Sequence, residues 1–281
     1  MHKKHPHIVN PLKKHGVVLY IVCSAATFFF AILFLSADPF SWERMNVYLF
    51  LGTLCLAFVT LLHASLTYSV RDALLLFTVS TLFTYINEFM GVRWGIPFGK
   101  YAYHSDLHPY LPGGIPFFII LSWFVLAYAP LVFLRWFISG SRGSSKHAPY
   151  KKAILCAVAL TATDLFLDPL ATQVETWEWS HSGFYFGIPI WNFIGWTLIG
   201  FLIFWVYFLL GGSKKSAIER GYFSLDGILV VLSILMAFLA NLALYKMVNS
   251  FVPASVTLIT LGPFYAYWFI TNHKARTSRD E

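Results

Sequence analysis

The chain has 281 residues, of which 58% are hydrophobic and 12% are charged, and its mean hydropathy is +0.65. Because a soluble domain carries roughly 25% charged residues, these figures exclude an ordinary soluble protein and predict a polytopic membrane protein. The net charge of +7 does not predict a nucleic-acid partner, since the basic residues lie mostly in short segments between apolar runs.

Apolar runs long enough to cross a membrane recur along the whole sequence. A helix needs about 20 mainly apolar residues to span the hydrocarbon core. We therefore expect an all-α fold, a polytopic transmembrane helical bundle of about eight spans that forms a single membrane domain over residues 1–281. The predicted spans are residues 16–37, 46–66, 72–90, 115–138, 152–171, 189–211, 224–246 and 252–271. The first is predicted to be a membrane helix and not a signal peptide, because its apolar run is long and no clear cleavage site follows it.

The Lys and Arg residues divide unevenly between the two ends of these spans. If successive spans alternate in direction, one side receives 16 of the 20 basic residues, including those of the basic tails 1–15 and 272–281. The other side receives Arg44, Arg93, Lys100 and Lys246. Since basic residues concentrate on the cytoplasmic side, we expect both termini in the cytoplasm and a multi-pass protein of the cell membrane.

Two loops rich in Trp, Tyr, Gly and Pro fall on the non-cytoplasmic side, at Gly91–Pro116 and Thr172–Pro189. An interfacial aromatic belt explains part of their composition but not the glycines, prolines and acids, so we expect folded loops that cover the outer end of the bundle. Each loop leads into a similar segment: GIPFFIILSW (Gly114–Trp123) and GIPIWNFIGW (Gly187–Trp196) align without gaps. The match indicates a short internal repeat of the third and fourth spans in the fifth and sixth.

Three carboxylates stand inside or near apolar helices, each in the non-cytoplasmic half: Glu88, Asp164 and Asp168. An ionised carboxylate at the centre of a membrane helix costs roughly 2.5–3.5 kcal/mol on insertion scales. Each must therefore face a polar cavity, hold a proton, pair with a loop cation or bond between helices. Pro169 disfavours helical geometry at the residue before it, so we expect the helix to end or kink there.

Aromatic and polar residues of the same layer are candidates for contact with an apolar substrate. Aromatic faces can stabilise a carbocation, and an Asn within a span can hold water or a carboxylate. The candidates are Trp94, Tyr101, Tyr103, Trp177, Trp179, Tyr185, Asn192 and Trp196. No metal site is expected, because zinc needs three or four placed ligands and HSDLH (His104–His108) supplies only two histidines.

Several motifs together resemble the signatures of the integral-membrane carotenoid biosynthesis family, which includes carotenoid 1,2-hydratases. They are FGKYAY (Phe98–Tyr103), DLFLDP (Asp164–Pro169), ETWEW (Glu175–Trp179) and GFYFGIPIWNFIGW (Gly183–Trp196). The resemblance covers roughly Thr84 to Gly200. It implies hydration of the terminal C1=C2 double bond of an acyclic carotenoid, with no cofactor. The partners it implies are the carotenoid, water, membrane lipid and other enzymes of carotenoid biosynthesis.

The residues suit this chemistry on their own terms. A buried carboxylic acid protonates C2, the charge develops at C1 between aromatic faces, and a water activated by a second carboxylate attacks C1. We expect Asp168 or Asp164 to be the acid and Glu88 or Glu175 to assist the water. The cation-stabilising rings would be Trp177, Trp179 and Tyr103. Both a forty-carbon lycopene-type substrate and a shortened apo-lycopene are compatible with these residues.

Two other functions fit parts of the pattern. Intramembrane acids and an internal repeat are also found in proton-coupled transporters. A transporter, however, needs polar residues through both halves of the bilayer, and these acids lie in the outer half. An intramembrane, Mg²⁺-dependent isoprenoid transferase would use the D-x3-D spacing of Asp164 and Asp168, but the second Asp-rich loop of such enzymes is absent from the sequence.

Overall fold

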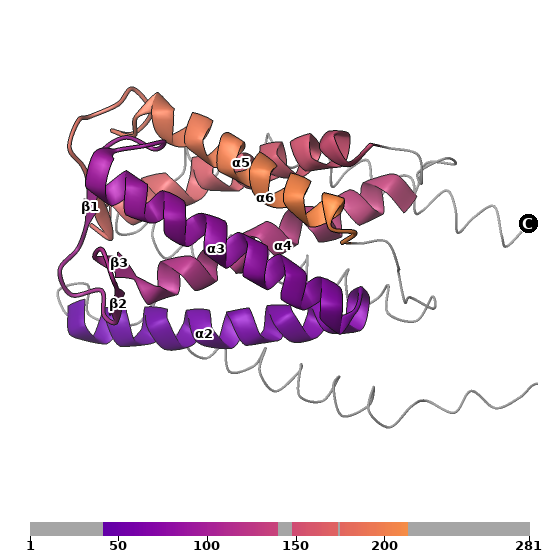
Figure 1. The fold of residues 1–281 in the computed structure, drawn as a ribbon. Helices are drawn as coiled ribbons and strands as arrows, with labels where there is room; N and C mark the ends of the chain where they lie inside the picture. Colours follow the sequence, from indigo (N-terminus) through magenta and orange to yellow (C-terminus); the bar gives the residue numbers. More distant parts are fainter. Residues whose placement is uncertain (1–41, 140–147, 174, 213–281) are drawn as a thin grey trace, which may run out of the picture.

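The structure is a computed structural model that describes residues 42–139, 148–173 and 175–212. Five helices make up most of this part of the chain and run side by side (Figure 1). They are α2 (Trp42–Thr67), α3 (Val70–Trp94), α4 (Phe117–Ser139), α5 (Pro149–Gln173) and α6 (Ile190–Leu209). Each corresponds to one of the five predicted spans between residues 46 and 211, so the prediction of helices there is confirmed.

Four of these helices, α2, α3, α5 and α6, are long and apolar enough to cross a membrane, and α4 adds the apolar stretch Phe117–Val132. The chain is therefore a mainly helical membrane protein. The predicted spans 16–37, 224–246 and 252–271 and the two basic tails lie outside the described residues. The count of about eight spans and the cytoplasmic position of both termini thus stay predictions.

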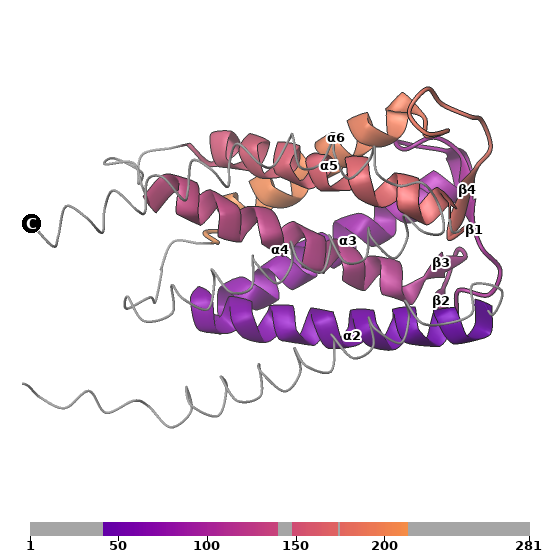
Figure 2. The ribbon, with the colours of Figure 1, turned by 180° about the vertical axis from the view of Figure 1, so that it is seen from behind.

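Helix α4 lies at the centre of the described bundle. It packs against α2, α3 and α5, while α6 packs against α3 and α5; seen from behind, α4 runs between α2 and α5 (Figure 2). Its side chains Phe124, Ala127 and Leu131 are at most 2% exposed, and the ring of Phe77 on α3 meets Phe124 edge to face at 5.1 Å. Contact on several sides explains why α4 is apolar around most of its circumference.

Helices α5 and α6 approach closely because small residues line their contact. A Cβ atom added at Gly200 would lie 3.1 Å from Leu160 and 3.4 Å from the backbone of Ala157. Thr161 and Thr197 bond across the same contact through their hydroxyl oxygens, 2.9 Å apart. Small residues and hydroxyl pairs are the usual means of helix association inside a membrane.

The two aromatic loops fold into short strands at one end of the bundle (Figure 1). Strand β1 (Tyr101–Tyr103) pairs antiparallel with β4 (Trp177–Trp179), and β2 (Tyr110–Leu111) pairs with β3 (Ile115–Pro116). The pairing joins one loop to the other, which confirms that both loops are folded and share one end of the bundle. The expectation of an all-α fold is corrected to a helical bundle with two small β-sheets.

The sequence led us to expect that helix α5 would end or kink at Asp168; the helix does not end there but continues through Pro169 to Gln173. A proline inside a helix leaves the carbonyl four residues earlier without its backbone donor. Here that carbonyl belongs to Leu165, and the hydroxyl of Tyr185 donates to it at 2.8 Å. The second loop thus supplies the bond that Pro169 removes, which explains how α5 accommodates the proline.

Close backbone contact at Gly183 fastens the second loop. Gly183 bridges to Gly187, and a Cβ atom at Gly183 would lie 1.9 Å from the carbonyl oxygen of Ile188. We expect Gly183→Ala to destabilise the protein by about 1–3 kcal/mol, the usual cost of overpacking. Gly200→Ala is the control, because its Cβ would meet mainly a movable side chain. Thermal unfolding of the detergent-purified variants measures the difference, and equal midpoints would contradict the expectation.

Candidate active site

A cavity of about 310 Å³ lies within the bundle beneath the two loops. Its walls come from all five helices and from β1 and β4, so residues distant in the sequence meet there. Two carboxylates face it, Glu88 from α3 and Asp168 from α5, and they are 4% and 1% exposed. Most of the remaining wall is apolar or aromatic. The cavity therefore combines two buried acids with an apolar lining.

Three neutral donors hold Glu88. Tyr101 and Tyr103 of β1 donate their hydroxyls to Oε2, the latter at 2.5 Å. The indole Nε1 of Trp123 on α4 donates to Oε1 at 3.1 Å. Both oxygens of this carboxylate are thus engaged by donors that carry no charge, so its hydrogen bonds are satisfied without a cation.

The two tyrosines remain donors at physiological pH. Burial raises the pKa of Tyr101 and of Tyr103 well above the usual range of a tyrosine, and the charge of Glu88 raises both further. A phenol in this setting keeps its proton. Tyr101 and Tyr103 can therefore orient Glu88 by donating hydrogen bonds and do not lose their protons to it.

Asn192 of α6 joins the two aspartates of α5. Its amide nitrogen donates to Oδ2 of Asp164 at 2.8 Å and to Oδ2 of Asp168 at 2.6 Å. The indole of Trp177 on β4 donates to the other oxygen of Asp168 at 2.7 Å. Asp164 is fully buried, and among the described residues its Oδ1 has no hydrogen-bond partner. Since two carboxyl groups that share one site cannot both be ionised cheaply, such a pair tends to hold one proton.

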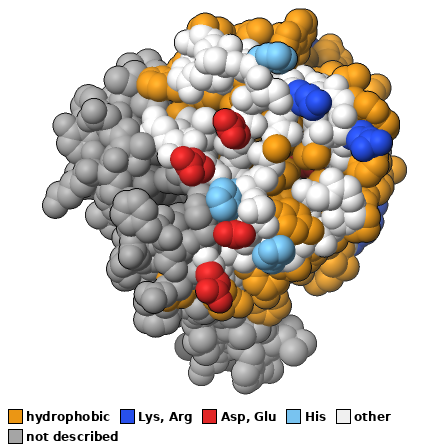
Figure 3. Space-filling view, turned by 90° about the vertical axis from the view of Figure 1, so that its left-hand side faces the viewer, with side chains coloured by type: hydrophobic (Ala, Val, Ile, Leu, Met, Phe, Trp, Pro, Cys, Tyr) orange, Lys and Arg blue, Asp and Glu red, His pale blue; other side chains and the backbone are white. Residues whose placement is uncertain are grey.

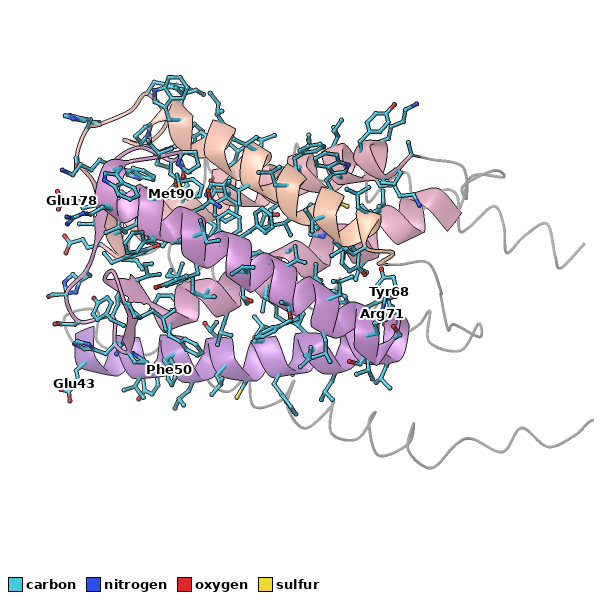
Figure 4. The ribbon with its side chains drawn as sticks, in the orientation of Figure 1. Glu43, Phe50, Tyr68, Arg71, Met90 and Glu178 are labelled. Atoms are coloured by element: carbon cyan, nitrogen blue, oxygen red, sulfur yellow. The ribbon has the colours of Figure 1, made fainter. Side chains whose placement is uncertain are left out.

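The spacing of the aromatic residues in the strands directs them into the site. Alternate residues of a strand point to opposite faces, so Tyr101 and Tyr103 share one face of β1, as Trp177 and Trp179 share one face of β4. All four line the cavity. The residues between them, Ala102 and Glu178, are exposed. Figure 4 shows Glu178 extending outward at the loop end of the bundle, whereas Arg71 lies at the other end.

Aromatic rings of β1 pack against rings of β4, and a ring of α4 packs against a ring of α6. Tyr101 packs on Trp179 with centroids 5.1 Å apart, and Tyr103 packs edge to face on Trp177 at 6.1 Å. Trp123 and Trp196 lie parallel, with centroids 4.0 Å apart and planes at 18°. These contacts give the cavity several fixed aromatic faces.

The structure brings most of the expected site residues together but not all of them. Glu88, Asp168, Asn192 and the aromatic residues Tyr101, Tyr103, Trp177, Trp179 and Trp196 line the cavity, and Asp164 lies behind Asp168. Glu175 does not reach the cavity: it is exposed, in a left-handed turn with φ of 60°. Trp94 is 61% exposed at the end of α3, and Tyr185 caps Leu165 outside the lining.

Trp123 is the main residue that the sequence did not single out. It looks like one more aromatic residue in an apolar helix, yet its indole nitrogen bonds Glu88. The available signal was the internal repeat, which aligns Trp123 with the candidate Trp196. Phe98, Ser122 and Thr176 also line the cavity; they lie within the quoted motifs or the repeat but were not singled out as site residues.

The cations of the loop end do not reach the buried acids. Arg93 and Lys100 are exposed, and the acids take their hydrogen bonds from Tyr, Trp and Asn. Figure 3 shows that this end of the molecule carries scattered acidic and His side chains and few Lys or Arg side chains. Within residues 42–139, 148–173 and 175–212, no group of three or more His, Cys, Asp or Glu is arranged to hold a metal ion.

Comparison with known proteins agrees with the motifs. The sequence model described as "Carotenoid biosynthesis protein" matches residues 44–263. The chain is 33% identical over 130 residues to the bisanhydrobacterioruberin hydratase of Haloarcula japonica, an alignment that covers 46% of this chain and 43% of that protein. The chain thus aligns with less than half the length of this curated relative. No solved structure matches it.

Asn192 should be essential to the stability of the site, because it is the donor that two buried carboxyl groups share. We expect Asn192→Leu to destabilise the protein by about 1–3 kcal/mol through unsatisfied acceptors. Adding Asp164→Leu should recover part of the loss, since apolar groups then replace both partners. Thermal unfolding in detergent tests the pair; a double variant that is less stable than Asn192→Leu alone would contradict this account.

Proposed function

This chain belongs to the carotenoid biosynthesis protein family, and from that premise we propose that it is a carotenoid 1,2-hydratase, a hydro-lyase that needs no cofactor. It adds water across the terminal C1=C2 double bond of an acyclic carotenoid, giving a tertiary alcohol. The observation that carries the proposal is the pair of carboxyl groups, Glu88 and Asp168, that face one apolar, aromatic cavity from different helices. The hydratase name of the relative supports it.

In this proposal Asp168 is the acid. Asp168 and Asp164 share Asn192, and one of the two carboxyl groups holds a proton so that the pair carries a single charge. Asp168 is the member of the pair that faces the cavity. Asp164, fully buried behind it, keeps the pair from losing that proton easily. Trp177 and Asn192 orient the carboxyl group from two sides, which leaves one direction for proton delivery.

Two carboxyl groups account for the proton that is added and the proton that is released in the reaction. Asp168 gives its proton to C2, and the electrons of the double bond form the new C–H bond, which leaves the positive charge at C1. The oxygen of a water molecule bonds to C1, and the proton that this water loses goes to Glu88, whose carboxylate accepts hydrogen bonds from three neutral donors. Proton exchange with solvent then returns Glu88 and Asp168 to their starting states.

The aromatic walls stabilise the intermediate charge. A tertiary cation within reach of an aromatic face is stabilised by about 0.5–2 kcal/mol per contact, more where water is excluded. The rings of Tyr103, Trp177 and the stacked Trp123–Trp196 pair line the cavity that the two acids share. No charged donor is needed, and none of the described cations is available.

A hydratase must also hold water in an apolar cavity. Trp179 lines the cavity, and its buried indole nitrogen has no hydrogen-bond partner in the part of the chain that the structure describes. Since buried donors are almost always satisfied, we assign its partner in the working enzyme to the reacting water or the hydroxyl of the product. The side chains of Ser122 and Thr176 offer further polar groups in the same wall.

Only the end of a carotenoid fits inside. A volume of about 310 Å³ is at the low end of ligand pockets, which run from about 300 to 1,000 Å³. The polyene must therefore lie largely outside, and the half-buried residues Leu49, Thr53 and Leu126 of α2 and α4 provide an apolar wall for it to follow. In this arrangement the enzyme recognises the end group of the carotenoid and accepts carotenoids of different length.

The transporter alternative depends on a polar path along the bundle. Helix α3 buries Ser80, Thr84 and Glu88 one turn apart, but the next position, Leu76, is apolar and 1% exposed. Along this helix Leu76 interrupts the polar line, and the next buried polar residue is Asp72 in the first turn. The Mg²⁺-dependent transferase would need both aspartates of α5 free for metal, whereas Asn192 bonds both. The hydratase fits these contacts best.

Replacing the acid should abolish hydration without unfolding the protein. In a bacterial host that accumulates lycopene or an apo-lycopene, we expect the wild type to yield a pigment heavier by one water with its chromophore unchanged. Asp168→Asn should lower that yield on the order of 10²–10⁴-fold, the usual contribution of a general acid. Chromatography with mass spectrometry measures the product.

Glu178→Gln is the matched control, because it removes an exposed carboxylate one residue from Trp177. Full activity of Asp168→Asn would remove this residue from the mechanism. Unchanged pigment in cells with confirmed wild-type protein in the membrane, with both substrates, would instead reject the hydratase and favour the transferase or the transporter.

The proposed place of the polyene can be tested separately from the acids. Thr53→Trp should fill the cavity beside α4 and lower hydration by about tenfold to a hundredfold, because a small displacement of substrate from the acids is costly. Leu54→Trp, on the exposed side of the same helix turn at 43% exposure, should retain activity. Similar yields from the two variants, measured in the same host, would show that the polyene does not follow α2.

A further inference from the structure

The site is built from two halves of the chain that repeat one construction. In the first half, α3 is followed by β1 and then by α4; in the second, α5 is followed by β4 and then by α6. Strands β1 and β4 pair antiparallel, with Tyr101 opposite Trp179 and Tyr103 opposite Trp177. An antiparallel pair has local two-fold symmetry, so the halves meet at equivalent positions.

The residues that the repeat aligns also meet in space. Trp123 and Trp196 hold the last position of the aligned segments Gly114–Trp123 and Gly187–Trp196, and their rings stack with centroids 4.0 Å apart. Contact between equivalent residues is what a two-fold relation between the halves produces. The cavity that both rings line therefore lies where the halves meet.

In each half, the carboxylate accepts hydrogen bonds from the strand and from the helix that follows that strand. Glu88 takes a bond from Tyr103 and another from Trp123. Asp168 takes one from Trp177 and another from Asn192. The helix donors differ, however: the residue aligned with Asn192 is Ile119, which has no polar group, and Trp123 fills the donor role one turn further along α4.

We propose that Trp123 is a positioning residue that acts through Glu88: its indole N–H fixes the carboxylate as the proton acceptor of the site, while its stacked partner Trp196 supplies only an aromatic face. The inference rests on the hydratase proposed above for its effect on rate. The Trp123–Glu88 contact itself is independent of the substrate. Trp196 makes no side-chain hydrogen bond to the described residues, so loss of its indole nitrogen leaves Glu88 untouched.

The test compares Trp→Phe substitutions that keep an aromatic ring. Trp123→Phe should lower the turnover number by about tenfold to a hundredfold, the effect of losing a hydrogen bond to a charged group, with little change in KM. Trp205→Phe is the control, because Trp205 is 38% exposed on α6, stacks on Phe201 and does not line the cavity. In a Glu88→Gln background, Trp123→Phe should cause no further loss; an additional tenfold loss there would overturn the proposal.

An infrared measurement separates this inference from the proposed reaction. The carboxylate band of Glu88 is assigned in detergent-purified protein by its disappearance in Glu88→Gln. It should shift in Trp123→Phe and in Tyr103→Phe, which removes another donor of the same carboxylate, but not in Trp196→Phe or Trp205→Phe. A band that Tyr103→Phe moves and Trp123→Phe does not would overturn the positioning role. If the band shifts as expected and the wild type hydrates no carotenoid, the contact stands and the hydratase assignment fails.

Discussion

Carboxyl groups buried in apolar helices impose the constraint on which the rest of this structure depends. Glu88, Asp164 and Asp168 are at most 4% exposed, and an unpaired charge at such a place costs several kcal/mol. In the described structure these groups accept hydrogen bonds from the neutral donors of Tyr, Trp and Asn side chains, and not from Lys or Arg. The choice matters chemically, because a bound cation would keep an acid permanently ionised, whereas neutral donors allow it to gain and lose a proton.

The same constraint explains why the loops are folded. The donors of Glu88 and Asp168 include Tyr103 and Trp177, which lie on β1 and β4 and not on the helices that carry the acids. Satisfying the carboxylates thus draws both loops onto the end of the bundle. The strand pairing then closes the cavity from above with aromatic side chains, while the alternate residues Ala102 and Glu178 face outward.

The sequence predicts those features that depend on composition or on a large energetic cost. Apolar length was sufficient for α2 to α6, and the cost of burial singled out Glu88 and Asp168. Positions set by backbone geometry escaped prediction: Glu175 is near Trp177 in the sequence, but its left-handed turn directs it outward. Pro169 was expected to end or kink α5, because nothing local shows that Tyr185 would satisfy the carbonyl of Leu165. The role of Trp123 was not predicted, because whether an indole donates a hydrogen bond to a carboxylate depends on which side chain faces it in the folded protein.

Inequality between the two halves is what makes a duplicated construction suitable for acid–base chemistry. Two identical halves would present two carboxylates with equal tendency to hold a proton, and neither would be a distinct acid or base. Here Glu88 keeps three donors to itself, whereas Asp168 shares Asn192 with a second aspartate. The second half therefore has one more acid and fewer donors for each. In the proposed mechanism the aspartate pair holds a proton more firmly than Glu88 does, and this difference sets the direction of proton transfer across the substrate.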